Sequence, residues 1–137
     1  MIKLIIGSKG QGKTKQLIEM VNNSVKSTNG NVVCVEQGMK LTLELDHDVR
    51  LIDAEEYKIK GYDSFYGFIA GILAGNYDIK EIYVDGILKI GAKGDTKDID
   101  GLGDLLEKIN ELTKDITIVF TVSSDEASLP DSVKKFK

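Results

Sequence analysis

Residues 1–14 read MIKLIIGSKGQGKT, and this stretch decides the fold. Residues 2–6 form a short, mostly apolar run that predicts a buried strand. Residues 7–14 then fit the pattern G-x-x-x-x-G-K-[ST] at every fixed position. Behind the pattern, four apolar residues recur at helical spacing: Leu17, Ile18, Val21 and Val25. A strand, a glycine-rich turn and a helix that begins at residue 12 or 13 are therefore expected in direct succession.

Each fixed residue of this pattern has a physical task beside a phosphate group. The glycines let the backbone curl with its N–H groups facing inward, and the following helix adds the positive end of its dipole. Lys13 is expected to reach the β- and γ-phosphates, and the Thr14 hydroxyl is expected to ligate Mg²⁺. The expected phosphate-binding residues span the whole turn: Gly7, Ser8, Lys9, Gly10, Gln11, Gly12, Lys13 and Thr14.

This pattern is the Walker A motif, and the chain resembles the P-loop nucleoside triphosphatase superfamily. Within that superfamily, the RecA-like group, which has an additional strand, fits best. The resemblance implies that Mg²⁺ and ATP or GTP are bound, with Lys13 also serving catalysis. ATP is favoured over GTP because the chain has no NKxD-type guanine motif.

Strand and helix patterns alternate along the rest of the chain. Apolar runs predict strands at residues 31–36, 81–85 and 116–122, and helical periodicity predicts helices behind Asp63 and from Asp100 or Gly101. Such alternation predicts an α/β fold: one domain over residues 1–137, with about five mainly parallel strands between helices. Ligand sites in such sheets lie at the carboxyl ends of the strands.

Three segments are harder to interpret. Within residues 37–57, a short strand near residues 49–52 and a helix near residues 39–45 are both compatible with the pattern. Residues 86–101 contain several glycines and charges, and a mobile loop is expected there. The end of the tail, residues 133–137, is compatible with an edge strand, a helical turn or a frayed end.

Asp85 ends an apolar strand, which is the Walker B pattern. A carboxylate at this place is expected to contact Mg²⁺ or one of its waters, across from Thr14. Many P-loop ATPases have a glutamate next in sequence to orient the attacking water, whereas this chain has Gly86, so slow hydrolysis is expected. RecA-like ATPases instead have this glutamate at the end of the strand after the P-loop helix. Glu36 matches that place and is a candidate catalytic residue, although an ordinary solvated strand end is equally compatible.

Three further residues have two interpretations each. In RecA-like ATPases the strand after Walker B lies between the Walker A and Walker B strands, and its polar end senses the γ-phosphate. Thr121 and Ser123 would take that role here, or they are ordinary polar residues at a strand end. Arg50 is the only arginine, and a solvated or structurally paired side chain is favoured over a finger offered to a neighbouring subunit.

Composition narrows the class of protein. The net charge of −4 gives no indication of nucleic-acid binding. The single cysteine, Cys34, lies in an apolar strand pattern and is expected to be a buried thiol. No leader or membrane-spanning run is evident, so no membrane insertion and a cytoplasmic location are expected.

Two functions remain after these observations. In the first, the chain is a small ATPase with slow hydrolysis, activated by self-assembly into a homo-oligomer or by a partner protein. In the second, it is a nucleotide-dependent binding switch in which residues 37–57 and 86–101 order around the γ-phosphate. A small-molecule or nucleoside kinase is a minority interpretation, because no lid or acceptor-base motif is visible.

Overall fold

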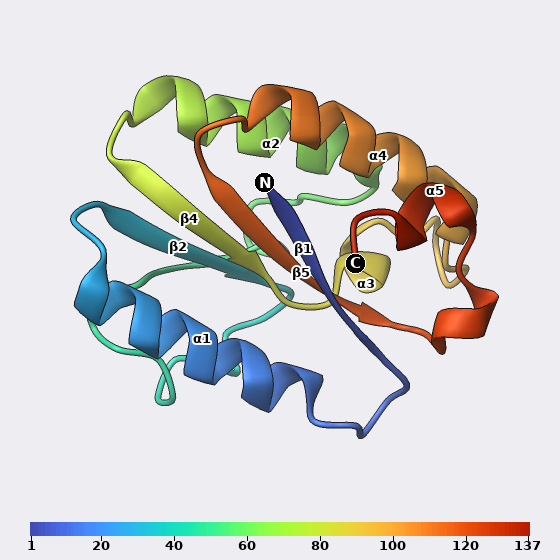
Figure 1. Ribbon diagram of the computed structural model, residues 1–137, viewed down its shortest axis with the longest axis horizontal. Helices are drawn as coiled ribbons and strands as arrows, with labels where there is room; N and C mark the ends of the chain where they lie inside the picture. Colours follow the sequence, from blue (N-terminus) through green and yellow to red (C-terminus); the bar gives the residue numbers. More distant parts are fainter.

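The computed structural model describes residues 1–137 and contains a single sheet of five parallel strands (Figure 1). The strands lie in the order β1-β5-β4-β2-β3, and every neighbouring pair is parallel. Their bounds are β1 Ile2–Gly7, β2 Asn31–Glu36, β3 Arg50–Asp53, β4 Ile79–Val84 and β5 Thr117–Ser123. The α/β fold is confirmed, and so is the expectation that the strand after Asp85 lies between the strands of the two motifs.

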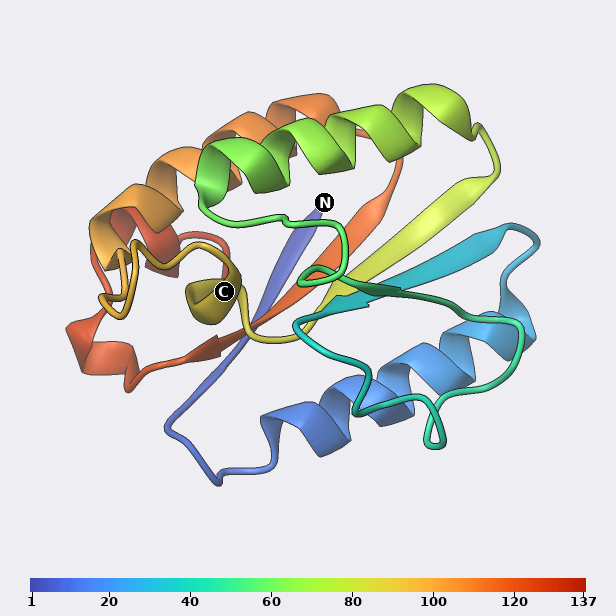
Figure 2. The same cartoon turned by 180° about the vertical axis from the view of Figure 1, so that it is seen from behind.

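Helices cover both faces of this sheet. Helix α1 (Lys13–Ser27) lies on one face, and α2 (Tyr62–Gly75) and α4 (Ile99–Leu112) lie side by side on the other (Figures 1 and 2). The two short helices α3 (Ile87–Ile90) and α5 (Asp131–Lys134) pack on β5 and α4, respectively. Because all five strands are parallel, their carboxyl ends lie at one edge of the sheet.

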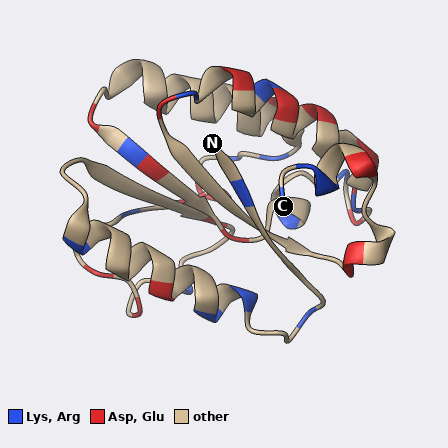
Figure 3. Ribbon diagram, viewed as in Figure 1, with Lys and Arg blue, Asp and Glu red and all other residues tan.

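The apolar residues that the strand patterns predicted form two cores, one on each face. The core beneath α2 and α4 is the larger, and in it the rings of Phe65 and Phe120 lie 6.1 Å apart between centroids. The core beneath α1 contains Cys34, which is fully buried as expected, and burial raises the pKa of its thiol. Strand β5 carries no charged residue, as suits a strand with neighbours on both sides (Figure 3).

Two helix starts and one loop differ from the sequence predictions. Helix α2 begins at Tyr62 after Gly61, so Asp63 lies in its first turn and not ahead of the helix as expected. Helix α4 begins at Ile99, because the Asp98 carboxylate caps it by accepting the Gly101 N–H at 2.9 Å. Residues 86–101 are not one long loop, since α3 forms directly after Gly86 and buries three apolar side chains: Ile87, Leu88 and Ile90.

The segments left open are also resolved. The short strand expected near residues 49–52 is present as β3, whereas residues 39–45 form turns and not a helix. Leu41 and Leu45 of these turns are buried in the core beneath α1, whereas Leu43 between them is exposed. The tail forms the one-turn helix α5 behind Pro130, anchored by the buried Val133.

None of the helices is both long enough and apolar enough to span a membrane.

Candidate functional site

The turn between β1 and α1 is a compact backbone loop with two left-handed residues. Gly10 has φ 86° and Gly12 has φ 80°, a conformation that side chains other than glycine rarely adopt. The Gln11 side chain closes the turn, because its Oε1 accepts the Ser8 N–H at 2.7 Å while Ser8 O accepts the Gln11 N–H at 3.2 Å. The backbone path therefore requires glycine at Gly12, which is a fixed residue of the pattern, and at Gly10, which is not.

The N-terminus of α1 is open at the end of this turn. Gly12 is its N-cap residue, no side chain caps it, and its first turn contains no acidic residue. The Lys13 ammonium folds back over the turn and donates to Ser8 O at 2.9 Å. The free N–H groups and the positive end of the helix dipole thus lie beside a lysine, an arrangement suited to an anion.

Asp85 meets the same turn from the sheet. It directly follows β4, and its backbone N–H is held by Val35 O at 2.9 Å. The Thr14 hydroxyl donates toward the Asp85 carboxylate, with its Oγ1 at 3.3 Å from Oδ1 and 3.2 Å from Oδ2. Residues 71 positions apart in the chain are thereby brought together, as the two motifs predicted.

Thr121 at the end of β5 fixes this carboxylate from the other side. Its hydroxyl donates to Asp85 Oδ1 at 2.7 Å and accepts the Gly86 N–H, also at 2.7 Å. Thr121 itself is almost completely buried, and both hydrogen bonds are partly buried. The orientation of Asp85 therefore depends on β5, the strand inserted between the two motif strands.

A cavity of about 280 Å³ lies between these groups, and no apolar residue lines it. The turn and the start of α1 form one wall, while residues that follow β4 and end β5 form the other. Four lysines and a single carboxylate give it a positive balance of charge. The lining residues are Lys9, Gly10, Gly12, Lys13, Thr14, Lys15, Asp85, Gly86, Lys89, Thr121 and Ser123.

These residues fit a magnesium nucleotide. The Thr14 hydroxyl and the Asp85 carboxylate supply the hard oxygen ligands that Mg²⁺ prefers, and they already lie within hydrogen-bond distance of each other. The open helix terminus and the lysines supply the donors and positive charge that a phosphate chain requires. The donor set is thus suited to both parts of such a ligand.

Glu36 lies next to this site without lining it. It ends β2, whose residue Val35 pairs with Val84 of β4, so Glu36 is a neighbour of Asp85 across the sheet. Its side chain is buried, and Oε2 accepts the Leu41 N–H at 2.8 Å. Burial raises the pKa of the Glu36 carboxyl, and the charge of Asp85 raises it further, against the lowering effect of the Leu41 hydrogen bond. The solvated interpretation of this strand end is wrong, whereas its catalytic role stays a prediction.

Of the remaining residues singled out from the sequence, one lines this cavity and one lies far from it. Ser123 lines the cavity, as its place at the end of β5 suggested. Arg50 is exposed, forms no ion pair and begins β3, at the amino end of an edge strand. It therefore cannot serve the site of its own chain. Lys89 also lines the cavity, but the sequence did not point to it because it belongs to no motif.

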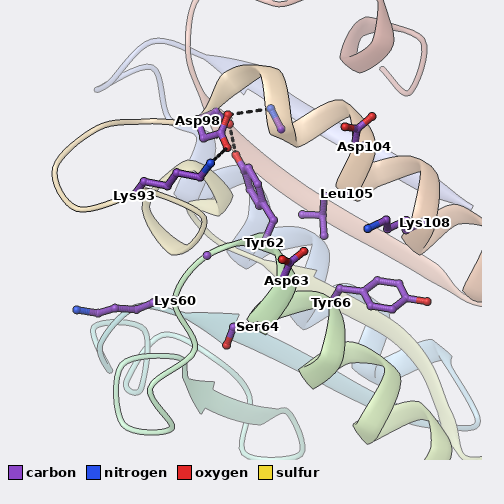
Figure 4. Close-up of a pocket in the computed structure, with 12 residues that line it drawn as sticks. Lys60, Tyr62, Asp63, Ser64, Tyr66, Lys93, Asp98, Asp104, Leu105 and Lys108 are labelled. Carbon is purple, nitrogen blue, oxygen red and sulfur yellow. Dashed lines mark hydrogen bonds and ion pairs between the residues drawn. The ribbon is translucent and has the colours of Figure 1, made fainter.

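A second polar cavity, of about 370 Å³, lies between the start of α2 and α4 (Figure 4). Its lysines and acids are equal in number, and Lys93 pairs with Asp98 at 3.7 Å. The Tyr62 hydroxyl donates to Asp98 O, and burial raises the pKa of this phenol. These contacts join the α3–α4 connection to α2, so we assign this cavity a structural role.

Comparisons with known proteins agree with the fold. The chain is similar in structure to a KaiC-like protein from the hyperthermophilic archaeon Pyrococcus horikoshii OT3, with a TM-score of 0.70 and 15% sequence identity. The match covers 98% of this chain and 68% of the other. No protein-family model and no curated protein matches the sequence. The comparison thus supports an α/β fold like that of the KaiC-like, RecA-like protein, with five parallel strands in the order β1-β5-β4-β2-β3.

Proposed function

We propose that this protein binds ATP together with Mg²⁺ and hydrolyses it slowly, or faster when a partner or self-assembly activates it. One observation carries this proposal: the Walker A turn and Asp85 meet across one polar cavity, with Thr14 Oγ1 at 3.2 Å from the Asp85 carboxylate. A chance match to the eight-residue pattern would not be expected to bring the second motif to the same place. The KaiC-like fold supports the same conclusion.

Each part of the cavity has a role in this proposal. Residues 7–12 wrap the phosphate chain with their backbone N–H groups, and Lys13 neutralises its charge. Thr14 and Asp85 hold Mg²⁺, while Thr121 keeps the Asp85 carboxylate in position. The metal ion supplies charge neutralisation at the phosphates when it is bound.

The residues next to Asp85 favour slow hydrolysis in the absence of a partner. Gly86 has no side chain with which to orient water, and Glu36 is held by the Leu41 N–H at the edge of the site. Turnover therefore requires the Glu36 carboxylate to act from this position or after the 37–48 turns shift. A partner or a second copy that moves these turns would activate hydrolysis. A partner that binds without moving them would leave the bound nucleotide intact, and the protein would then act as a nucleotide-dependent switch.

Thermal unfolding with a panel of nucleotides tests the binding proposal. A ligand that binds only the folded chain stabilises it, by about 2.7 kcal/mol when its concentration is a hundred times Kd. We expect Mg·ATP to raise Tm in proportion to the logarithm of its concentration, and AMP to raise it far less because it lacks the β- and γ-phosphates. Equal shifts with ATP and AMP would contradict binding through the P-loop.

The Glu36→Gln variant tests the proposed catalytic role of this carboxyl group. Because glutamine cannot accept a proton from water, we expect steady-state phosphate release to fall at least about tenfold while the affinity for Mg·ATP is retained. Glu44→Gln, an exposed glutamate of the neighbouring turns, is the matched control and should leave turnover unchanged. Unchanged phosphate release in Glu36→Gln would remove Glu36 from the mechanism.

The raised pKa of Glu36 also predicts that the wild type and Glu36→Gln differ in how their stability depends on pH. A carboxyl group whose folded-state pKa is raised binds more protons when folded, so its contribution to stability is lost as pH rises. The loss begins above the unfolded pKa of about 4.5 and is complete above the folded pKa. The free energy of unfolding of the wild type, relative to Glu36→Gln, should therefore fall across this window in urea titrations without nucleotide.

A further inference from the structure

Lys89 is the one lysine of the cavity that does not come from the Walker A turn or the start of α1. It lies in α3, four residues after Asp85, and faces the cavity from the wall opposite the turn. No ion pair of the chain includes it, since these join Lys93 to Asp98, Lys135 to Glu107 and Lys137 to Glu126. Its positive charge is therefore available to a ligand.

The backbone that carries Lys89 is firmly anchored. The other three residues of α3, Ile87, Leu88 and Ile90, are at most 1% exposed. Lys89 is therefore the only residue of this helix that reaches solvent. Gly86, before the helix, has φ 81° and donates its N–H to Thr121. This one-turn helix thus places a single cation beside the metal-binding carboxylate.

The side chain of Lys89 also runs in a defined direction. Its Cδ lies 3.8 Å from the place that a Cβ on Gly86 would occupy, so its apolar stem passes along the residue after Asp85. In the proposed complex the turn would surround the inner phosphates, and Thr14 and Asp85 would hold Mg²⁺, which would neutralise charge on the phosphate chain. The terminal phosphate then lies toward Asp85, Gly86 and Thr121, on the side from which Lys89 approaches.

No arginine can take this place. Arg50 is the only arginine of the chain and lies at the amino end of β3, the edge strand farthest from β1 in the sheet. Lysine binds phosphate as a mobile point charge and tolerates more than one geometry. Lys89 is therefore the only cation of this chain that lines the cavity from the side of the Asp85 wall.

We propose that Lys89 binds the terminal phosphate and so makes the site prefer a nucleoside triphosphate over a diphosphate. The inference rests on the proposed function, because it needs the phosphate chain to lie in the Walker A turn. It adds a ligand-discriminating residue that comes from the same chain and not from a neighbouring subunit.

The test is calorimetric titration of ADP and of a non-hydrolysable ATP analogue, each with Mg²⁺, into the wild type and Lys89→Met. Because Lys89→Met removes a charge-assisted contact, the affinity for the triphosphate is expected to fall about 10- to 100-fold, while the affinity for ADP changes little. Lys89→Arg keeps the charge and should retain most of the preference. Lys114→Met, an exposed lysine before β5, is the control for net charge and should bind like the wild type.

The outcomes separate this inference from the function on which it rests. Equal weakening of both nucleotides in Lys89→Met, with an unchanged Tm, would indicate a general charge effect and would overturn the inference. Unchanged affinity for both would overturn it as well, and both results leave nucleotide binding intact. Absence of binding by the folded wild type would overturn the proposed function and this inference together.

Discussion

Lys13→Ala is expected to lower the affinity for Mg·ATP by about a hundredfold or more, because charge-assisted hydrogen bonds contribute about 1.5–3 kcal/mol each. Lys13 is the motif lysine, and its ammonium already lies over the turn at 2.9 Å from Ser8 O. Two phosphates lose a donor at once when it is removed. Displacement of a fluorescent ATP analogue by unlabelled ATP measures the effect.

The fold itself should tolerate this substitution. The side chain is only half-buried, and its one hydrogen bond is to an exposed carbonyl, so the free energy of unfolding should change by less than about 1 kcal/mol. Lys15→Ala is the matched control, since Lys15 lines the same cavity from the same helix but is not a fixed residue of the motif. Equal losses in the two variants would mean that general positive charge, and not the motif, binds the nucleotide.

Asp85→Asn is expected to remove most of the Mg²⁺ dependence of nucleotide binding. Asparagine has nearly the same shape and can still accept the Thr14 and Thr121 hydroxyls, so the change isolates the negative charge. With one hard anionic ligand lost, the affinity for ATP should differ little between Mg²⁺ and EDTA. The wild type should lose at least about tenfold in affinity when EDTA is added.

Asp115→Asn provides the control for this second prediction. Asp115 is exposed and precedes β5, so it lies at the opposite end of the sheet from Asp85. It should retain the Mg²⁺ dependence of the wild type. A full Mg²⁺ dependence in Asp85→Asn would show that another group holds the ion.

Much of the fold was predictable because parallel strands with neighbours on both sides leave long apolar runs. Strands β2 and β5 each appear in the sequence as such a run, and α1 has a clear helical period behind the motif. The strand order followed from the resemblance and not from the runs themselves. Helix α3 escaped prediction because a single turn, only four residues long, is too short to show a period.

Some residues of the candidate site were likewise predictable from the sequence, and others were not. Residues 7–14 and Asp85 were found because their residue types are fixed by the chemistry of phosphate and Mg²⁺. The burial of Glu36 could not be foreseen, because it depends on turns that fold back so that the Leu41 N–H reaches the carboxylate at 2.8 Å. Lys89 had no sequence signal beyond its nearness to Asp85, since its direction depends on the burial of its neighbours in α3 and on the path of its side chain beside Gly86.

The partner-activated and switch functions make different use of the same contacts. The Gly86–Thr121–Asp85 hydrogen bonds connect the cavity with the start of α3. In the switch, the triphosphate should protect α3 and residues 37–48 from hydrogen exchange more than ADP does. Equal protection with the two nucleotides would leave only the ATPase.

In the proposed complex, residues 7–14 and Asp85 form one site for Mg·ATP. Calorimetric titration of ATP into the wild-type chain, once with Mg²⁺ and once with EDTA, measures whether this site exists. The expected result is saturable binding with one ATP per chain, which weakens when the metal ion is removed. No heat of binding from a chain that unfolds cooperatively on heating would contradict a shared Mg·ATP site.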